Sequence, residues 1–160
     1  SASKTPSVKK VVLTSSSLAV TEGHPKQKIF TEEDWSNIKD KKFAAYTRSK
    51  VIAEQAAWEF VENIREGNRF ALTALHPGLI LGPPLTEEQG SSVTMIKRFL
   101  DGEMPGNPAI HMTAVDVRDV AKCHLEAMRR PESDGQRILL NAKGSLWFYD
   151  LAVLLKNEFE

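Results

Sequence analysis

The feature that most constrains this chain is the alternation of short apolar runs with longer helical patterns. The runs are bounded by charges or turn residues, as buried strands are: "VVLTSS", "RFALTALHPGLILGPP" and "RILLNA". The second is expected as one strand that runs into a Pro/Gly-rich loop. Helical patterns stand between and after these runs, and this rhythm is typical of α/β proteins with a parallel sheet. The sequence therefore predicts an α/β fold, with a sheet that is thin at three strands.

The longest helical pattern runs from about Ala44 to Glu66, and Gly67 with Asn68 supplies the signal that ends it. Side chains that recur at helical spacing along it are Tyr46, Lys50, Ala53, Ala57, Phe60, Val61 and Ile64. Asp116 is expected to cap a later helix whose last turn contains Arg129. A short helix is expected in "SSVTMIKRFLDGE" and a last one in "YDLAVLLKNEFE".

Composition excludes several classes of protein. The 160 residues have a formal net charge of zero, so no overall field attracts nucleic acid or an anionic membrane. No apolar run is long enough to span a membrane, and the first residues lack the apolar core of a secretory signal. Cys123 is the only cysteine and the four histidines are scattered, so we expect no metal site, no disulfide and a cytoplasmic protein.

Tyr46 and Lys50 are four residues apart at the start of the long helix, which makes them neighbours on its surface. An ammonium beside a phenol favours tyrosinate, and such a tyrosine can exchange a proton with a carbonyl or hydroxyl group. Lysine also has three donors that can hold the hydroxyls of a ribose. Taken alone, the pair is more often a packed tyrosine and a solvated lysine.

Two other stretches strengthen this interpretation. The hydroxyls of "TSSS" follow a strand, at the edge where open α/β sheets bind ligands, and a serine there can support a developing oxyanion. Pro77 and Gly78 form a turn whose backbone can approach a flat ligand closely. His76 precedes this turn and is expected to make a structural hydrogen bond.

In this order, four stretches resemble the extended short-chain dehydrogenase/reductase family, and within it the carbonyl reductases similar to dihydroflavonol reductase and cinnamoyl-CoA reductase: "VKKVVLTSSS", "AAYTRSKVIAEQAAWEFV", "HPGLILGPPL" and "VDVRDVAKCHLEAM". The resemblance implies a Rossmann-like, three-layer fold, of which this chain is the central to C-terminal portion. It implies reduction of a ketone or aldehyde with NADPH, or with NADH as the alternative. Residues of about 8–82 and 114–142 would form the Rossmann core, and those of about 83–113 and 143–160 the substrate side.

The resemblance also assigns roles to single residues. Ser16 would be the catalytic serine, Tyr46 the acid/base, and Lys50 the residue that tunes Tyr46 and holds the nicotinamide ribose. Further cofactor contacts are expected from Ser15, Pro77, Gly78, Leu79, Ile80 and Ser92. The regions from Gln27 to Asp40 and from Leu85 to Gly106 would shape the substrate pocket.

One departure from the family pattern is severe. The family begins with a strand and a G-x-x-G-x-x-G turn that holds the cofactor diphosphate, and none of the nine glycines here forms that turn. We therefore expect the chain to be an interior piece of a longer enzyme. In isolation it is expected to bind dinucleotide poorly.

Two alternatives stay open at this point. A nucleotide-sugar epimerase or dehydratase, or a 3β-hydroxysteroid dehydrogenase, would use the same three residues, although Thr47 stands where epimerases commonly have glycine and so favours a reductase. A non-catalytic binding or assembly module is the other alternative. The alanines at 53, 56 and 57 would permit helix packing in a homodimer.

Overall fold

The computed structural model describes residues 2–24, 29–39, 44–64, 69–86, 90–104, 106 and 108–159. Its main sheet is parallel and has the strand order β1-β2-β6. The three strands are β1 (Lys10–Thr14), β2 (Ala71–Pro77) and β6 (Arg137–Leu140). The three-stranded parallel sheet that the sequence predicts is therefore confirmed.

The helices of the described residues also follow the prediction. They are α1 (Ala45–Glu62), α2 (Ser91–Leu100), α3 (Val117–Arg129) and α4 (Phe148–Phe159). Asp116 caps α3 as expected, because its Oδ1 accepts a hydrogen bond of 2.7 Å from the backbone N–H of Arg118. Gly67 and Asn68, the predicted end of the first helix, lie outside the described residues.

The chain divides into two compact units. Unit 1 comprises Ser1–Pro77 and Ala121–Leu140, and unit 2 comprises Gly78–Val120 and Asn141–Glu160. The boundaries expected from the sequence, at about 82, 114 and 142, differ from these by a few residues. The assignment of a cofactor role and a substrate role to the two parts stays a prediction.

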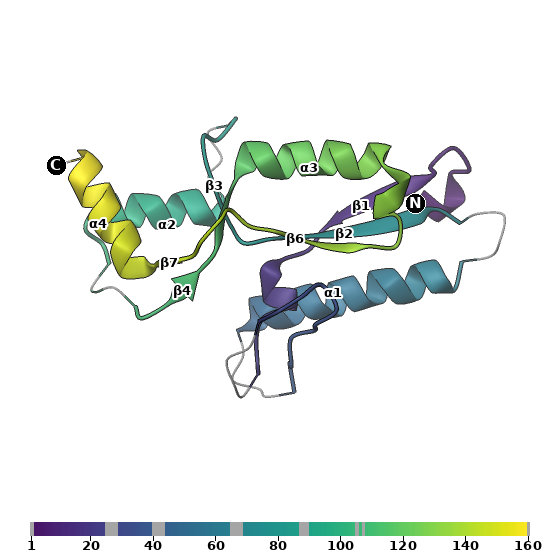
Figure 1. Cartoon of the computed structure of the whole chain (residues 1–160), viewed down its shortest axis with the longest axis horizontal. Helices are drawn as coiled ribbons and strands as arrows, with labels where there is room; N and C mark the ends of the chain where they lie inside the picture. The colour runs from purple at the N-terminus through teal and green to yellow at the C-terminus, as the bar shows by residue number, and fades with distance from the viewer. Residues whose placement is uncertain are drawn as a thin grey trace. The chain divides into compact units, whose positions relative to one another are not determined.

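Unit 1 has three layers (Figure 1). The sheet lies between α1 on one face and the part of α3 that belongs to this unit on the other. The middle strand β2 is covered on both faces, so that Leu72, Ala74 and Leu75 are at most 3% exposed. A parallel strand buried on both faces has no alternation of polar and apolar residues, which explains the near-continuous apolar run in this part of the sequence.

The second apolar run forms two strands where one was expected, and the break between them lies at the turn predicted for Pro77 and Gly78. β2 ends at Pro77, and the next three residues form β3 (Leu79–Leu81), which pairs with β5 (Ala114–Asp116). The break is at Gly78, where an added Cβ would lie 2.5 Å from the carbonyl oxygen of Thr113 and 2.6 Å from Oδ1 of Asn141. Only glycine permits so close an approach.

A second small sheet in unit 2 has no counterpart in the sequence prediction. β4 (His111–Met112) pairs with β7 (Leu146–Trp147) in antiparallel register. The rings of His111 and Trp147 lie 4.7 Å apart between centroids. Strands of two residues are too short to produce a periodic pattern.

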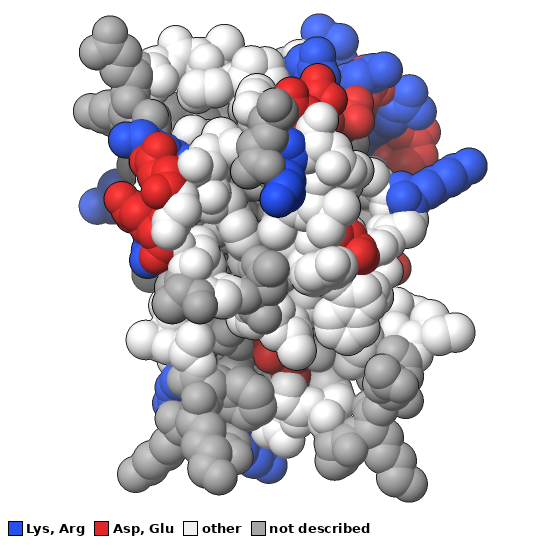
Figure 2. Space-filling model, turned by 90° about the vertical axis from the view of Figure 1, so that its left-hand side faces the viewer, with Lys and Arg blue, Asp and Glu red and all other residues white. Residues whose placement is uncertain are grey.

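The helices of unit 2 expose apolar side chains. Those on α2 and α4 are Leu100, Tyr149, Val153, Leu154 and Phe159. Figure 2 views the molecule from the side where α4 lies in Figure 1, and it shows many uncharged residues on this face, with the largest group of charged side chains at the upper right. Most buried apolar side chains of the described residues belong to unit 1, which therefore holds the main core. No helix in the described ranges has the length and apolar character needed to cross a bilayer.

Candidate active site

The start of α1 lies against the carboxyl end of β1. Tyr46 and Lys50 are one helical turn apart, and the ammonium nitrogen of Lys50 is 5.6 Å from the centroid of the Tyr46 ring. The same nitrogen is 3.5 Å from the backbone carbonyl oxygen of Thr14, the last residue of β1. The structure therefore brings the predicted phenol and ammonium together with the strand end that leads into the serines.

Ser16 follows this strand end and is only 7% exposed. Its Oγ accepts a hydrogen bond of 3.2 Å from the backbone N–H of Leu18 and so caps the short 3₁₀ helix Ser17–Ala19. A hydroxyl has one donor besides its acceptor sites, and the contacts found among the described residues leave that donor unused. Tyr46 is 54% exposed. The hydroxyls of both residues thus keep the capacity to donate to a ligand.

Ser15 is directed into the interior. Its Oγ donates a hydrogen bond of 2.5 Å to Oε2 of Glu54 in α1, and the residue is 5% exposed. Its backbone N–H donates to the carbonyl oxygen of Leu75 in β2. These bonds engage both donors of Ser15 with the protein, so its expected contact with a cofactor stays a prediction.

Glu54 is a buried carboxylate, 1% exposed, at the centre of unit 1. Its Oε2 accepts hydrogen bonds from Ser15 Oγ at 2.5 Å and from His76 Nε2 at 2.7 Å. Its Oε1 accepts from Arg137 Nε at 2.7 Å and from Trp58 Nε1 at 3.2 Å. A carboxylate has about four acceptor positions, and four donors fill them here.

These contacts keep the carboxyl group ionised. Burial raises the pKa of Glu54, but hydrogen bonds from His76, Arg137 and Ser15 outweigh this effect and lower the pKa from 4.5 to about 2. The hydrogen bond to the carboxylate assigns a proton to Nε2 of His76, whose other ring nitrogen is buried without a partner among the described residues. The structural hydrogen bond predicted for His76 is confirmed.

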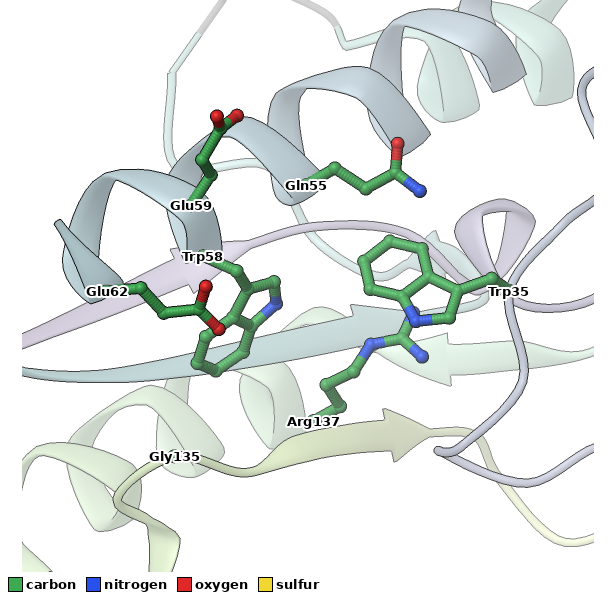
Figure 3. Close-up of a pocket in the computed structure, with 7 residues that line it drawn as sticks. All are labelled: Trp35, Gln55, Trp58, Glu59, Glu62, Gly135 and Arg137. Atoms are coloured by element: carbon green, nitrogen blue, oxygen red, sulfur yellow. The ribbon is translucent and has the colours of Figure 1, made fainter.

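Arg137 connects this carboxylate with the segment that follows the first polar loop. Its Nη1 donates hydrogen bonds of 2.6 Å to the backbone carbonyl oxygens of Glu32 and Asp34. Its guanidinium carbon lies 3.8 Å from the ring centroid of Trp35, and Figure 3 shows the Arg137 side chain reaching from β6 to this indole. Cation–π contact and hydrogen bonding thus hold part of the predicted pocket region 27–40 against the sheet; Gln27, Lys28 and Asp40 lie outside the described residues.

Comparison with known proteins identifies the family. The model of the 3-beta hydroxysteroid dehydrogenase/isomerase family matches residues 1–150. The chain belongs to this family.

Proteins similar in sequence to this chain include named reductases. The NADPH-dependent methylglyoxal reductase of Saccharomyces cerevisiae is 32% identical over 96% of this chain and 48% of its own length. A cinnamoyl-CoA reductase of Medicago truncatula is 33% identical over 88% of this chain and 43% of its own length. The chain therefore spans about half the length of the curated relatives it matches, and the resemblance to extended short-chain carbonyl reductases is confirmed.

Solved structures of the family share the fold. The yeast methylglyoxal/isovaleraldehyde reductase complexed with NADPH superposes with a TM-score of 0.82 at 32% identity, covering 96% of this chain and 48% of that one. Vestitone reductase from alfalfa, at 23% identity and a TM-score of 0.72, supports the fold alone. The Rossmann-like parallel α/β fold is thus confirmed, and it corresponds to the C-terminal half of the extended structures.

Glu54 is a buried polar residue of this chain that the sequence analysis did not identify. The helical pattern used for the prediction includes Ala53 and Phe60, but both are exposed, and Phe60 is 53% exposed. The buried face of α1 instead consists of Thr47, Val51 and Glu54. The spacing of Glu54 could have indicated its position, because it stands three residues after Val51 and four after Lys50 and so shares a helix face with Val51. A carboxylate on a buried face needs hydrogen-bond partners.

A hollow of about 560 Å³ lies beside Arg137 (Figure 3). It is lined by Trp35, Gln55, Trp58, Glu59, Glu62, Gly135 and Arg137. On α1 it begins at Gln55, nine residues after Tyr46, which is about 13 Å along the helix axis. The hollow is therefore separate from Tyr46, the predicted acid/base of this chain.

The remaining predicted cofactor contacts are divided between the units. Pro77 is buried at the end of β2 in unit 1. Gly78, Leu79 and Ile80 belong to unit 2, and Ser92 is the second residue of α2 in the same unit. All four are partly exposed. Their contacts with a cofactor stay predictions.

Proposed function

We propose that the natural protein carrying this sequence is an NADPH-dependent carbonyl reductase of the extended short-chain type. The observation that carries the proposal is the position of Lys50, whose ammonium lies beside both the Tyr46 ring and the end of β1. The named activities of the reductases similar to this chain support the same class of reaction. The substrate is proposed to be a small-molecule ketone or aldehyde.

In the proposed reaction, NADPH when bound supplies a hydride to the carbonyl carbon. Tyr46 gives its phenolic proton to the carbonyl oxygen, so that an alcohol and the oxidised cofactor are the products. Ser16 donates a hydrogen bond to the same oxygen while negative charge develops there. The positive charge of Lys50 stabilises the tyrosinate that remains until a proton returns from solvent.

The donors of this chain suit a nicotinamide nucleotide. Lys50 has three donors, of which the carbonyl of Thr14 takes one, so that the others are available for the ribose hydroxyls. The backbone of Pro77, Gly78, Leu79 and Ile80, the backbone carbonyl of Ser15 and the side chain of Ser92 are proposed to make further contacts, while the Ser15 hydroxyl stays bonded to Glu54. These contacts rest on the family resemblance alone.

An assay with the natural protein tests this function. We expect absorbance of NADPH at about 340 nm to fall when methylglyoxal or another small aldehyde or ketone is added, with NADPH used in preference to NADH. Interconversion of UDP-sugars without net consumption of NADPH would replace the proposal by an epimerase. Oxidation of a 3β-hydroxysteroid, without any carbonyl reduction, would replace it by a steroid dehydrogenase.

Two further proposals concern the cellular compartment and the oligomeric state. We place the protein in the cytosol because Cys123, the only cysteine, has no partner for a disulfide within the chain. A homodimer through α1 is proposed because the small residues Ala53 and Ala56 are exposed on this helix. Both proposals are independent of the reaction.

A further inference from the structure

We propose that Ser15 and Glu54 form a positioning pair, which holds Ser16 in place relative to Tyr46 and Lys50. The inference rests on the proposed function and explains how the strand end that carries Ser16 is held in position relative to α1. It concerns two residues that need not touch substrate: one in the strand end and one in the helix.

The first observation is the way Glu54 connects separate elements. Its four hydrogen bonds come from the end of β1, from β2, from β6 and from α1 itself, through Ser15, His76, Arg137 and Trp58. With every acceptor position occupied, the carboxylate has little freedom to turn. Glu54 is therefore a fixed point in α1 for the strands around it.

The second observation is where this fixed point lies in the chain. Glu54 is one helical turn after Lys50 and two turns after Tyr46, on the same helix. Ser15 is bonded directly to Ser16 and gives Glu54 its shortest hydrogen bond, at 2.5 Å. The contact of Lys50 with the same strand end, at 3.5 Å, is longer and weaker. The Ser15–Glu54 bond is thus the stronger side-chain connection between the helix of the proposed acid and the strand end of the proposed oxyanion donor.

Small displacements matter at such a site. A misplacement of about 1 Å can lower a reaction rate by about 100-fold, because hydrogen bonds and orbital alignment in the transition state depend steeply on geometry. Loss of the Ser15 hydroxyl removes the stronger of the two side-chain connections that the described residues show between the strand end and α1, and leaves only the 3.5 Å contact of Lys50 with Thr14. It removes no group that takes part in chemistry. We therefore expect a loss in turnover without a comparable loss in cofactor affinity.

Two variants of the natural protein test the pair. Ser15→Ala removes the donor on the strand end, and Trp58→Phe removes a donor to the same carboxylate from within α1. Both delete one hydrogen bond to Glu54, but only the first removes a bond between α1 and the residue next to Ser16. We expect Ser15→Ala to lower kcat by about tenfold or more with the dissociation constant of NADPH changed less than about threefold. For Trp58→Phe we expect kcat within about threefold of the parent.

A measurement on the 160-residue chain makes the test independent of activity. The backbone N–H groups of Leu18 and Ala19 donate to Oγ and to the carbonyl oxygen of Ser16. Hydrogen exchange at these two amides should become about tenfold faster in Ser15→Ala and stay near the parent rate in Trp58→Phe. If the parent protein reduces no carbonyl, the proposed function fails, and the exchange rates still decide on the positioning pair. Equal effects of the two variants on exchange, or no effect of Ser15→Ala on exchange or on kcat in an active parent, would overturn the inference.

Discussion

Replacement of Tyr46 by phenylalanine is expected to lower the turnover of carbonyl reduction in the natural protein by about 100-fold or more. The substitution keeps the ring, whose centroid is 5.6 Å from the Lys50 ammonium, and removes only the hydroxyl. Without a phenolic proton, the oxygen of the substrate must take its proton from water in the step that receives the hydride. The measurement is kcat, from the initial rate of NADPH oxidation at saturating substrate.

The chain offers a matched control for this variant. Tyr149 is the only other tyrosine, and it is 62% exposed on α4, a little more than Tyr46. Tyr149→Phe makes the same chemical change outside the proposed acid–base group and is expected to leave kcat within about threefold. A loss below about threefold in Tyr46→Phe itself would remove this residue from the acid role.

Acid is expected to destabilise the 160-residue chain through Glu54. The pKa of this group is about 2 in the folded chain and 4.5 when the group is unperturbed, as in an unfolded chain. The folded value is the lower one, so the stabilisation is complete above pH 4.5 and is lost as the pH falls toward 2. At about 1.4 kcal/mol for each pKa unit, the difference corresponds to about 3 kcal/mol of unfolding free energy. Urea unfolding at several pH values across this window measures the loss.

Added salt and a surface variant distinguish the loss of stability caused by Glu54 from the loss caused by exposed ion pairs. Arg118 lowers the pKa of Asp116 to about 2, and Arg130 lowers the pKa of Glu126, but these pairs are at the surface and are screened by salt. The loss caused by the buried Glu54 should persist in about 0.5 M NaCl and in Glu126→Gln. An unfolding free energy that stays constant between pH 4.5 and 2 in salt would contradict the account of Glu54.

The sequence predicts the elements of the fold well because their signals are local. A buried parallel strand is a short apolar run, α1 and α3 show helical spacing, and α3 has its capping residue at the expected place. Asp116, which caps α3, is an example of a residue whose role is readable from its neighbours alone. The family resemblance then placed these elements in one Rossmann-like sheet.

The interruption at Gly78 shows where local signals end. Pro77 and Gly78 predict a turn, but the partners that force glycine there are Thr113 and Asn141, far away in the sequence. β3 likewise pairs with a distant segment, because its partner strand β5 comprises Ala114–Asp116. No pattern within the strand itself distinguishes a continuous strand from one that changes sheets.

The candidate site was predictable only in part for the same reason. Tyr46 and Lys50 are helix neighbours, and the ammonium of Lys50 lies beside the end of β1. The catalytic roles that the resemblance gives to these residues stay predictions. The partner of Glu54 in β6, Arg137, is 83 residues away, and its guanidinium also binds the segment before α1. Apolar periodicity did not identify the buried residues of α1, which are Thr47, Val51 and Glu54, because two of these three are polar. Glu54 is buried together with its hydrogen-bond partners.

One measurement bears most directly on the central claim, that Tyr46 and Ser16 act together on one carbonyl oxygen. It is the position of that oxygen in a crystal structure of the natural protein with NADPH and a carbonyl substrate or analogue. The account predicts that the hydroxyl oxygens of Tyr46 and Ser16 both lie within about 2.6–3.2 Å of it. A complex in which the two side chains face opposite sides of the sheet, with the carbonyl oxygen near neither, would contradict the account.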